Sequence, residues 1–116
     1  MNAKKKGNKG EHSFAHWLVD NGIKAFRNSM SGGSVWKGDI ANNLDLTIEV
    51  KTVGALNVQE AWRQVKRDSI IAHNTPVLAI HYNGMPDKTW LMVIHSEDFM
   101  EMLKAWKGLS TGQIEK

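Results

Sequence analysis

The segment from Leu46 to Thr52 constrains the fold most, because its residues alternate regularly between apolar and polar. Side chains of a β-strand point to opposite faces in turn, so this period of two predicts a strand that is buried on one face. The apolar face holds Leu46, Ile48 and Val50, and the polar face holds Thr47, Glu49 and Lys51. A Glu-x-Lys pair of this kind is by itself typical of a weak, exposed ion pair, so the strand alone predicts no function.

A helix is predicted after this strand. From Asn57 to His73 the apolar residues recur at helical spacing, and basic residues lie on another side. Before the central strand, the sequence predicts a helix over 10–21, a strand over 23–27, a loop over 28–38 and a strand beginning at 39. After the helix it predicts two strands, over 76–82 and 89–94, around a turn at 83–84. A last helix has Ser96 as its N-cap and ends at about Trp106. The order αβββαββα predicts an α/β or α+β domain.

The size and composition of the chain fit a single domain spanning residues 1–116. The chain has 116 residues, of which 41% are apolar, and it contains no cysteine. Disulfides, zinc–thiolate sites, iron–sulfur clusters and cysteine nucleophiles are therefore excluded. We expect a flexible basic arm over 1–9 and a frayed tail over 108–116, because both ends are polar. Five tryptophans supply a large share of a small core, or part of a surface.

The charge of the chain is mildly basic. Fifteen Lys and Arg against twelve Asp and Glu give a net charge of +3, and the basic excess lies before residue 85. This balance is compatible with a nucleic acid as partner. The lysines of the arm resemble the start of a signal peptide, but polar residues at 10–12 stand where an apolar stretch is required. No segment approaches the length of a membrane span, so we expect no membrane partner.

Asp39 lies ten residues before Glu49 and begins the preceding strand. If the two strands pair as a hairpin, Asp39, Glu49 and Lys51 converge at one end of the sheet. Two carboxylates repel each other unless a cation lies between them, and hard oxygen ligands suit Mg²⁺ or Mn²⁺. Such a metal polarises a phosphodiester, while Lys51 offsets the charge that develops on its oxygens or orients the attacking water. The pattern therefore predicts a nuclease site.

Further segments of the chain occur in the order found in one family. They are Lys4-Lys5-Lys6-Gly7, Glu11, Ala25-Phe26-Arg27, Ser31-Gly32-Gly33, Gly38-Asp39-Ile40, Ile48-Glu49-Val50-Lys51, Gln64-Val65 and Pro76-Val77-Leu78-Ala79-Ile80. With this set, residues 4–83 resemble the PD-(D/E)xK nucleases, and more narrowly the archaeal-type Holliday junction resolvases and their phage relatives. The resemblance implies an α/β fold with a restriction-endonuclease-like core, in which a central mixed β-sheet is flanked by helices. The last third of the chain matches this family poorly.

The resemblance also implies roles for individual residues. The implied metal ligands are Asp39, Glu49, the carbonyl of Val50 and, through water or for a second ion, Glu11. The implied catalytic set is Glu11, Ser31, Asp39, Glu49, Lys51 and Gln64, with Lys51 as the catalytic lysine and Ser31 as a contact to the scissile phosphate. Gly38 stands where the family has proline, which predicts a looser turn before Asp39.

A basic surface and a glycine-rich loop are expected to contact DNA. The loop over 28–38 offers backbone N–H groups and hydroxyls, which suit phosphates, and its Trp36 either stacks on an unpaired base or folds onto the core. The expected DNA contacts are Lys4, Lys5, Lys6, Lys9, Arg27, Ser31, Gly32, Ser34, Trp36, Lys37, Arg63, Lys66 and Arg67. Taken alone, the basic helix face is also typical of ordinary solvation. Gly33 and Gly38 have the spacing of a phosphate-binding loop, but Asp39-Ile40 replaces its Lys-Ser/Thr, so no nucleotide cofactor is expected.

The histidines and the late tryptophans predict no separate site. We expect His73, His81 and His95 to satisfy local hydrogen bonds, because none of them belongs to a hydrolase motif. Trp90 and Trp106 lie far from the site motifs along the chain. Each of these two tryptophans is expected either in the core or in a dimer interface.

These observations together predict a Mg²⁺-dependent endonuclease that selects DNA by structure and resolves four-way junctions. Resolution requires paired cuts on two symmetry-related strands, so one small active site predicts a two-fold homodimer. A second possibility is a virus-type replication and repair nuclease, a class that shares the Asp, Glu-x-Lys and Gln pattern and cuts flaps or other branched DNA. A third is a catalytically silent DNA-binding module in which the same charges are structural. We expect the protein in the cytoplasm with the nucleoid, or in the host cytoplasm if a phage encodes it.

Overall fold

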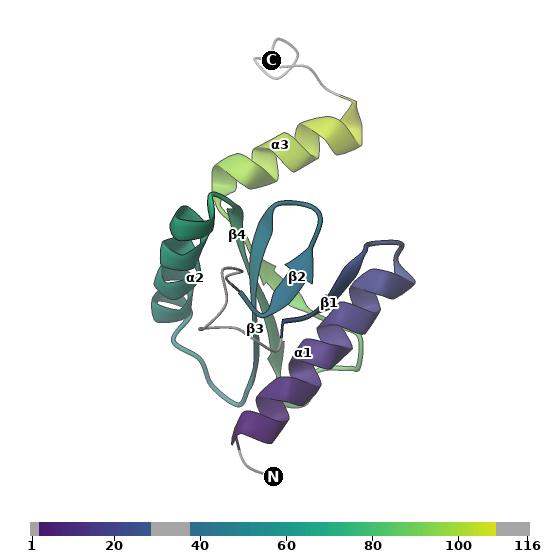
Figure 1. Cartoon of the computed structure of the whole chain (residues 1–116), viewed down its shortest axis with the longest axis vertical. Helices are drawn as coiled ribbons and strands as arrows, with labels where there is room; N and C mark the ends of the chain where they lie inside the picture. The colour runs from purple at the N-terminus through teal and green to yellow at the C-terminus, as the bar shows by residue number, and fades with distance from the viewer. Residues whose placement is uncertain (1–2, 29–37, 109–116) are drawn as a thin grey trace.

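The computed structural model describes residues 3–28 and 38–108, with side chains from residue 9 onward. Its elements in chain order are α1 (Ala3–Asp20), β1 (Ala25–Arg27), β2 (Ile40–Asn42), β3 (Leu46–Val53), α2 (Val58–Ala72), β4 (Thr75–Tyr82), β5 (Leu91–Val93) and α3 (Ser96–Lys107). Figure 1 shows these elements along the chain. The expected loop residues 29–37 and the expected tail from 109 onward lie outside the described residues.

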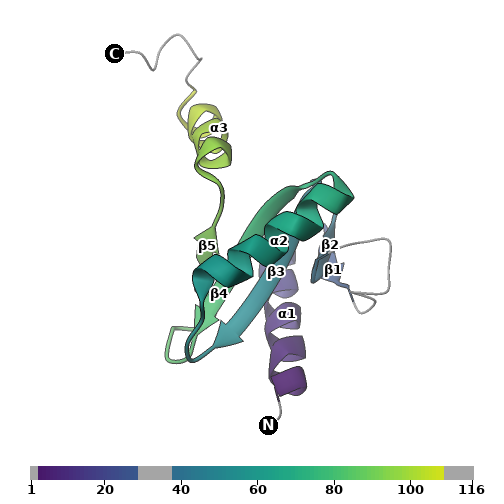
Figure 2. The same cartoon turned by 90° about the vertical axis from the view of Figure 1, so that its left-hand side faces the viewer.

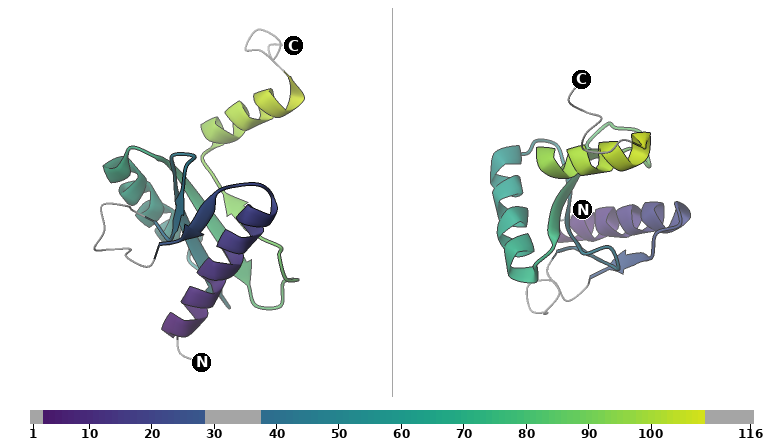
Figure 3. Two further views of the ribbon diagram at one scale, coloured as in Figure 1. Left: turned by 45° about the vertical axis from the view of Figure 1, so that its right-hand side comes forward. Right: turned by 90° about the horizontal axis from the view of Figure 1, so that it is seen from above.

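A mixed three-stranded sheet, in the order β3-β4-β5, forms the centre of the fold. β3 and β4 run parallel from the pair Leu46 and Thr75 to the pair Val53 and Tyr82, and β5 runs antiparallel to β4. Parallel neighbours need a crossover, which α2 supplies. Helices α1 and α2 lie on opposite faces of the sheet (Figure 3). The expected α/β class with a mixed sheet is confirmed.

The core has one apolar cluster on each face of the sheet. The cluster beneath α1 consists of Phe14, Ala15, Ile40, Ile48, Val50, Val77 and Ala79. The cluster beneath α2 consists of Ala61, Val65, Leu78 and Ile80. The β4 run Val77 to Ile80 is buried throughout, as expected for a strand covered on both faces, whereas β3 contributes apolar side chains mainly to the α1 face.

Strands β1 and β2 form a separate antiparallel ribbon, so the expected ladder between β2 and β3 is absent among the described strands. The turn between β2 and β3 is held instead by the side chain of Asn42. Its Oδ1 accepts the N–H of Leu46 over 3.2 Å, and its Nδ2 donates to the carbonyl of Leu46 over 2.9 Å. A side chain that bonds the backbone in this way replaces ladder bonds and lets the two strands diverge.

Several expected boundaries need correction. α1 begins at Ala3 rather than at Gly10, so most of the expected flexible arm is helical. Alanine and lysine have high helix propensities, and a helix that is already packed extends easily at its end. The N-cap of α3 is His95, whose Nδ1 accepts the N–H of Glu97 over 3.2 Å, rather than Ser96. The connection between β4 and β5 spans residues 83–90, which is longer than a two-residue turn.

Two other expectations, for α2 and for His81, are confirmed. α2 occupies the segment expected for it, with Asn57 as N-cap and His73 as C-cap. The Nδ1 of His81 lies 3.0 Å from the carbonyl oxygen of Thr89, which is a local hydrogen bond.

The two late tryptophans differ in their exposure. Trp90 packs edge-on against Phe14, whereas 76% of Trp106 is exposed. None of the described helices combines the length and the apolar character that crossing a membrane requires.

Candidate active site

A tight turn at Gly38 places Asp39 against β3. Gly38 has a φ of +98°, and a Cβ atom there would lie 3.0 Å from the carbonyl oxygen and 3.1 Å from the nitrogen of Ile48. Only glycine combines this positive φ with so close an approach of two backbones. Proline, whose ring fixes φ near about −65°, does not fit. The expectation that Gly38 loosens the turn is wrong, because glycine is the residue that lets the turn close on β3.

Hydrogen bonds fix the backbone on both sides of Asp39. Its N–H donates to the carbonyl of Ile48 over 2.7 Å, and its carbonyl accepts the N–H of Asn28 over 2.8 Å. The buried side chain of Asn28 donates from Nδ2 to the carbonyl of Gly38 over 3.0 Å. Asn28 therefore clamps the turn that carries Asp39. Sequence reasoning missed this residue, because a polar residue beside a glycine-rich loop has no pattern that predicts its burial.

The Asp39 carboxylate bonds directly to the backbone of β3. Its Oδ2 accepts the N–H of Val50 over 2.8 Å, where a strand carbonyl would accept in a ladder. The N–H and the carbonyl of one strand residue point to the same side, so the carbonyl of Val50 faces this edge of β3 as well. The edge therefore presents a carboxylate and a carbonyl to the same region.

Glu49 lies beside Asp39 on the α2 face of β3, where only 7% of it is exposed. Burial is the main cause that raises the pKa of Glu49 to about 8, and the negative charge of Asp39 and a hydrogen bond between the two carboxyl groups contribute to the rise. The ammonium of Lys51 acts in the opposite direction. Asp39 and Glu49, expected to converge, do so, and a hydrogen bond joins their carboxyl groups.

Lys51 borders a hollow between the end of β3 and the start of α2. The hollow has a volume of about 240 Å³, and Gln64 lines it together with Lys51 and Asn57. Lys51 is half-buried, whereas Gln64 is exposed on α2. The structure therefore brings Gln64, expected from the resemblance alone, next to the polar end of β3.

Glu11 approaches the site from α1 but is bound to Arg27 of β1. The Nε atom of Arg27 donates to Oε1 of Glu11 over 2.9 Å, and both side chains are largely buried. Burial and the charge of Asp39 raise the pKa of Glu11, while Arg27 and Lys51 lower it. The charges of Asp39 and Lys51 therefore act on Glu11 at the edge of the site. Arg27, expected as a DNA contact, has a carboxylate partner inside the protein.

The donor set at this edge suits a hard divalent cation. The carboxyl groups of Asp39 and Glu49 meet at this edge, and the Val50 carbonyl is a third oxygen of the kind that Mg²⁺ accepts. Within residues 3–28 and 38–108, no three histidine, aspartate or glutamate side chains gather closely enough to hold a metal ion by themselves. A cation here would therefore use two carboxylates, backbone oxygen and water.

Apart from Arg27, the expected DNA contacts fall into three groups. Lys9, Arg63, Lys66 and Arg67 are exposed, the last three on one helix. Lys4, Lys5 and Lys6 lie in α1. Ser31, Gly32, Ser34, Trp36 and Lys37 lie outside the described residues. Arg63, Lys66 and Arg67 therefore give α2 a group of three exposed cations.

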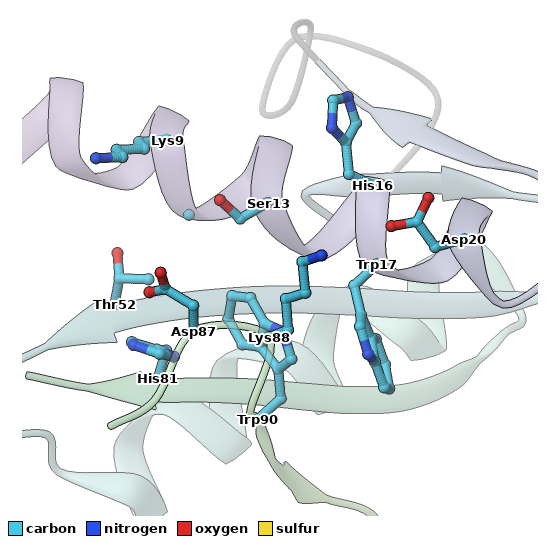
Figure 4. A pocket seen from close by; sticks show the side chains of 11 residues that line it. Lys9, Ser13, His16, Trp17, Asp20, Thr52, His81, Asp87, Lys88 and Trp90 are labelled. Atoms are coloured by element: carbon cyan, nitrogen blue, oxygen red, sulfur yellow. The ribbon is translucent and has the colours of Figure 1, made fainter. Parts of the chain in front are cut away.

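A larger hollow, of about 630 Å³, lies on the other face of the sheet between α1 and the connection from β4 to β5. Figure 4 shows its lining, which includes His16, Trp17 and Trp90. Thr52, rather than Glu49 or Lys51, faces it from β3. The hollow therefore does not contain the carboxyl pair.

Asp68 is a second residue that sequence reasoning missed. Its negative charge contributes to the raised pKa of Glu49, and it is half-buried on α2. It lies seven residues after the buried Ala61 and three after the buried Val65, so helical spacing places it on the side that faces the sheet. That spacing is a signal from which the residue was predictable.

A scan against known protein families finds no matching family, and a search of curated proteins finds no relative. Any functional conclusion therefore depends on the geometry of the Asp39 and Glu49 site.

Proposed function

We propose that this chain is a Mg²⁺-dependent DNA endonuclease that resolves four-way junctions. One observation carries the proposal: Asp39 and Glu49, from two different segments, place their carboxyl groups in contact beside Lys51. A buried carboxyl pair costs folding free energy, so its presence at a sheet edge is better explained by function than by stability.

The succession of α1, β1, β2, β3, α2 and β4 supports the finer fold proposal, a restriction-endonuclease-like core. In this proposal the oxygens of Asp39, Glu49 and Val50 lie on one edge of β3. The crossover helix α2 leaves the polar end of the strand accessible through the hollow beside Lys51.

The cation would be held by the carboxylates of Asp39 and Glu49 and by the carbonyl of Val50, with Mn²⁺ able to replace Mg²⁺. When bound, the cation supplies Lewis-acid polarisation of the scissile phosphodiester. The Val50 N–H holds one oxygen of Asp39, which fixes the orientation of this carboxylate.

The remaining residues act on the phosphate and on the position of the ligands. The ammonium of Lys51 attracts a phosphate and offsets negative charge that develops on its oxygens. Gln64 offers an amide donor and acceptor in the same hollow. Arg27 holds Glu11 at the edge of the site. In the proposed site Glu11 binds the cation through water from this edge.

The substrate class follows from the surface and from the geometry of the reaction. Exposed Arg63, Lys66 and Arg67 line one helix near the site, and cations distributed in this way bind phosphate backbones rather than base edges. Resolution of a four-way junction needs two cuts related by two-fold symmetry, so the proposed enzyme is a homodimer.

The experiment incubates purified protein with an immobile four-way junction, a flap and a linear duplex of matched sequence, with Mg²⁺ or with EDTA. The test variant is Asp39→Asn, because the amide oxygen can still accept the Val50 N–H while the charge is lost. The matched control is Asp45→Asn, since Asp45 is exposed and has a φ of +58°, which asparagine tolerates.

Symmetric nicks confined to the junction, lost with EDTA and in Asp39→Asn but retained in Asp45→Asn, would establish a resolvase. Cutting mainly of flaps would assign the chain to the repair nucleases. Binding of branched DNA without cleavage under any metal condition would support the silent DNA-binding module and reject the enzyme.

A further inference from the structure

The hollow of about 630 Å³ between α1 and the connection from β4 to β5 lies apart from the carboxyl pair. Its volume is within the range of about 300–1,000 Å³ that is usual for small-molecule sites. Figure 2 shows that the connection turns at the end of the sheet where α1 begins, away from α3. Gly10 lets α1 lie directly on β3 beside the hollow, because a Cβ atom there would lie 2.9 Å from the Oγ1 atom of Thr52. Glycine weakens a helix, so the sequence favours this close packing over the stability of α1.

Two tryptophans form aromatic walls of the hollow, and the core holds both of them in place. The rings of Trp17 and Trp90 each pack against Phe14, at centroid distances of 5.6 Å and 4.9 Å. Phe14 is only 1% exposed, so neither indole moves without disturbing the core. Figure 4 shows both indoles beside the same hollow. The hollow therefore offers two fixed aromatic surfaces, against which a planar ring packs favourably.

The wall of the hollow also contains a hydrogen-bond donor and an acceptor. The buried indole N–H of Trp90 has no partner among the described residues. A buried donor of this kind is unfavourable and rare unless something else pairs with it. The Nδ1 of His81 lies 3.0 Å from the carbonyl oxygen of Thr89, which only accepts, so Nδ1 carries the proton and Nε2 of the neutral ring is an acceptor. The wall therefore suits a ligand that both accepts and donates hydrogen bonds.

The charges around the hollow balance. Lys9 and Lys88 line it, and so do Asp20 and Asp87. Two cations and two anions favour a neutral polar ligand over an ion of one sign, so an aromatic cage for a cation is disfavoured although two tryptophans alone would suit one. A nucleobase is planar, aromatic and neutral, and its edge carries both donors and acceptors. It matches the walls, the polar groups and the charge balance together.

The start of α1 supplies positive charge for a phosphate backbone. Lys4, Lys5 and Lys6 lie in the first turns of this helix, and Lys9 lines the hollow itself. Cations distributed in this way attract the phosphates of a nucleic-acid strand without reading its sequence.

We propose that the hollow takes the base of an unpaired nucleotide, packed against Trp17 and Trp90, with the phosphates of the same strand toward the lysines of α1. Base binding of this kind does not rest on the proposed nuclease activity. A free nucleotide offers the same base as an unpaired position in a strand does, so the experiment includes both sources.

The first test measures binding with EDTA present, so that no metal-dependent cleavage occurs. The probes are a dye-labelled strand of five thymidines and a matched strand of five abasic residues with the same phosphates, both titrated by fluorescence anisotropy. The wild type should bind the thymidine strand about tenfold more tightly or more, the effect expected for stacking of one base. Trp17→Leu should lose this preference, because it keeps an apolar side chain against Phe14 but removes the indole. Trp106→Leu is the matched control, since Trp106 is 76% exposed on α3 and does not line the hollow.

A second variant leaves the core intact. Ser13 is exposed on α1 and lines the hollow, whereas its neighbour His12 is exposed and does not line it. Ser13→Leu places a larger side chain at the hollow and should reduce the preference for the thymidine strand to nearly one, while His12→Leu should retain it. Circular dichroism and urea denaturation of each variant confirm that the fold is kept.

The ¹H–¹⁵N signals of the indole groups locate the base and distinguish its source. The signals of Trp17 and Trp90 should shift with the thymidine strand and stay in place with the abasic strand. Thymidine monophosphate that binds as tightly as the strand would identify a pocket for a free nucleotide. A dissociation constant at least about tenfold higher would identify the strand as the ligand, because its further phosphates add contacts to α1.

Three outcomes would overturn the proposal. The first is equal affinity of the wild type for the thymidine and abasic strands. The second is a preference that survives both Trp17→Leu and Ser13→Leu. The third is a preference that Trp36→Leu abolishes and Trp17→Leu leaves intact, which would assign base stacking to Trp36. Because the probes are unbranched and no metal is present, failure here is distinct from failure of the nuclease assay.

Discussion

The two faces of β3 differ in character. Ile48 and Val50 pack against Phe14 on the face toward α1. The face toward α2 carries Thr47, Glu49 and Lys51. Both faces are buried near the middle of the strand, with Ile48 2% and Glu49 7% exposed. The first face contributes favourable burial of apolar surface. The second buries a carboxyl beside another carboxyl, which opposes folding. One strand therefore stabilises the fold on one side and offsets part of that stability on the other.

The hydroxyl of Thr47 adds to this difference between the two faces of β3. It is fully buried and has no hydrogen-bond partner among the described residues. A buried hydroxyl without a partner costs about 1–3 kcal/mol. The α2 face thus carries two unfavourable polar groups within three residues of β3, while the α1 face carries none at the neighbouring positions Ile48 and Val50.

The largest effect is expected for Glu49→Gln, which keeps the shape of the polar face and removes its charge. We expect junction cleavage to fall by more than about 1000-fold, equivalent to about 4 kcal/mol of transition-state stabilisation. Single-turnover cleavage with Mg²⁺ measures the change. Glu97→Gln, an exposed glutamate on α3, is the control and should cleave normally. Equal activity of Glu49→Gln and the wild type would remove Glu49 from the proposed site.

The same variant gives the opposite result for stability. Because the pKa of Glu49 is raised from 4.5 to about 8 by burial and by Asp39, the folded chain binds a proton that the unfolded chain releases between these pH values. The contribution of Glu49 to the free energy of unfolding should therefore be highest below pH 4.5, fall as pH rises by up to about 1.4 kcal/mol per pH unit, and level off above about pH 8. Glu49→Gln should lack this fall and have the higher Tm at pH 8. A Tm difference independent of pH would contradict the assignment.

Phe14→Ala tests the apolar face and should leave the chemistry of the polar face unchanged. Phe14 is 1% exposed and contacts the rings of Trp17 and Trp90, at centroid distances of 5.6 Å and 4.9 Å. Its truncation should lower the free energy of unfolding by about 3–5 kcal/mol, measured by urea denaturation. The control Phe26→Ala removes the same side chain from a position that is 68% exposed, and it should cost less than about 1 kcal/mol.

The two faces of β3 are predictable from the amino-acid sequence through its periodicity. The alternation from Leu46 to Thr52 assigns Ile48 and Val50 to one face and Glu49 to the other, because the period of two is a property of the strand alone. The same holds for α2 and its Asn57 cap. The close contact of Asp39 with Val50 has another origin, since it depends on how the turn at Gly38 packs on a strand ten residues away.

Gly38→Ala is expected to have the next largest effect, because it disturbs the turn that joins Asp39 to the polar face. The new Cβ would approach the Ile48 backbone to 3.0 Å at a φ of +98°, at a cost of about 1–3 kcal/mol. Gly84→Ala is the matched control, since Gly84 has a φ of +91° with nothing within 4 Å, and so measures the backbone strain alone. Gly38→Ala should lose more stability than Gly84→Ala in urea, and should also cleave more slowly. Equal losses would show that the close approach is unimportant.

The ion pair between Glu11 and Arg27 was beyond sequence reasoning, because only the tertiary packing of α1 against β1 brings the two residues together. Nothing in the spacing of sixteen residues distinguishes Arg27 as a partner of Glu11 from Arg27 as a DNA contact. The same limit applies to α3. Its apolar residues Phe99, Met102 and Trp106 recur at helical spacing in the sequence, but a helical pattern does not reveal whether the protein itself covers them.

The smallest effect is expected for Arg27→Gln, which removes the cation that joins the α1 edge to the site. The two side chains are 21% and 17% exposed, so their pairing should contribute about 1 kcal/mol, and less below the raised pKa of Glu11. Urea denaturation at pH 7 measures the loss, and Glu11→Gln with the double variant completes a double-mutant cycle. Exposed Arg63→Gln is the control. A coupling free energy near zero would mean that Arg27 acts through its other contacts, and Glu11 would then lack the positioning that the proposed site assigns to it.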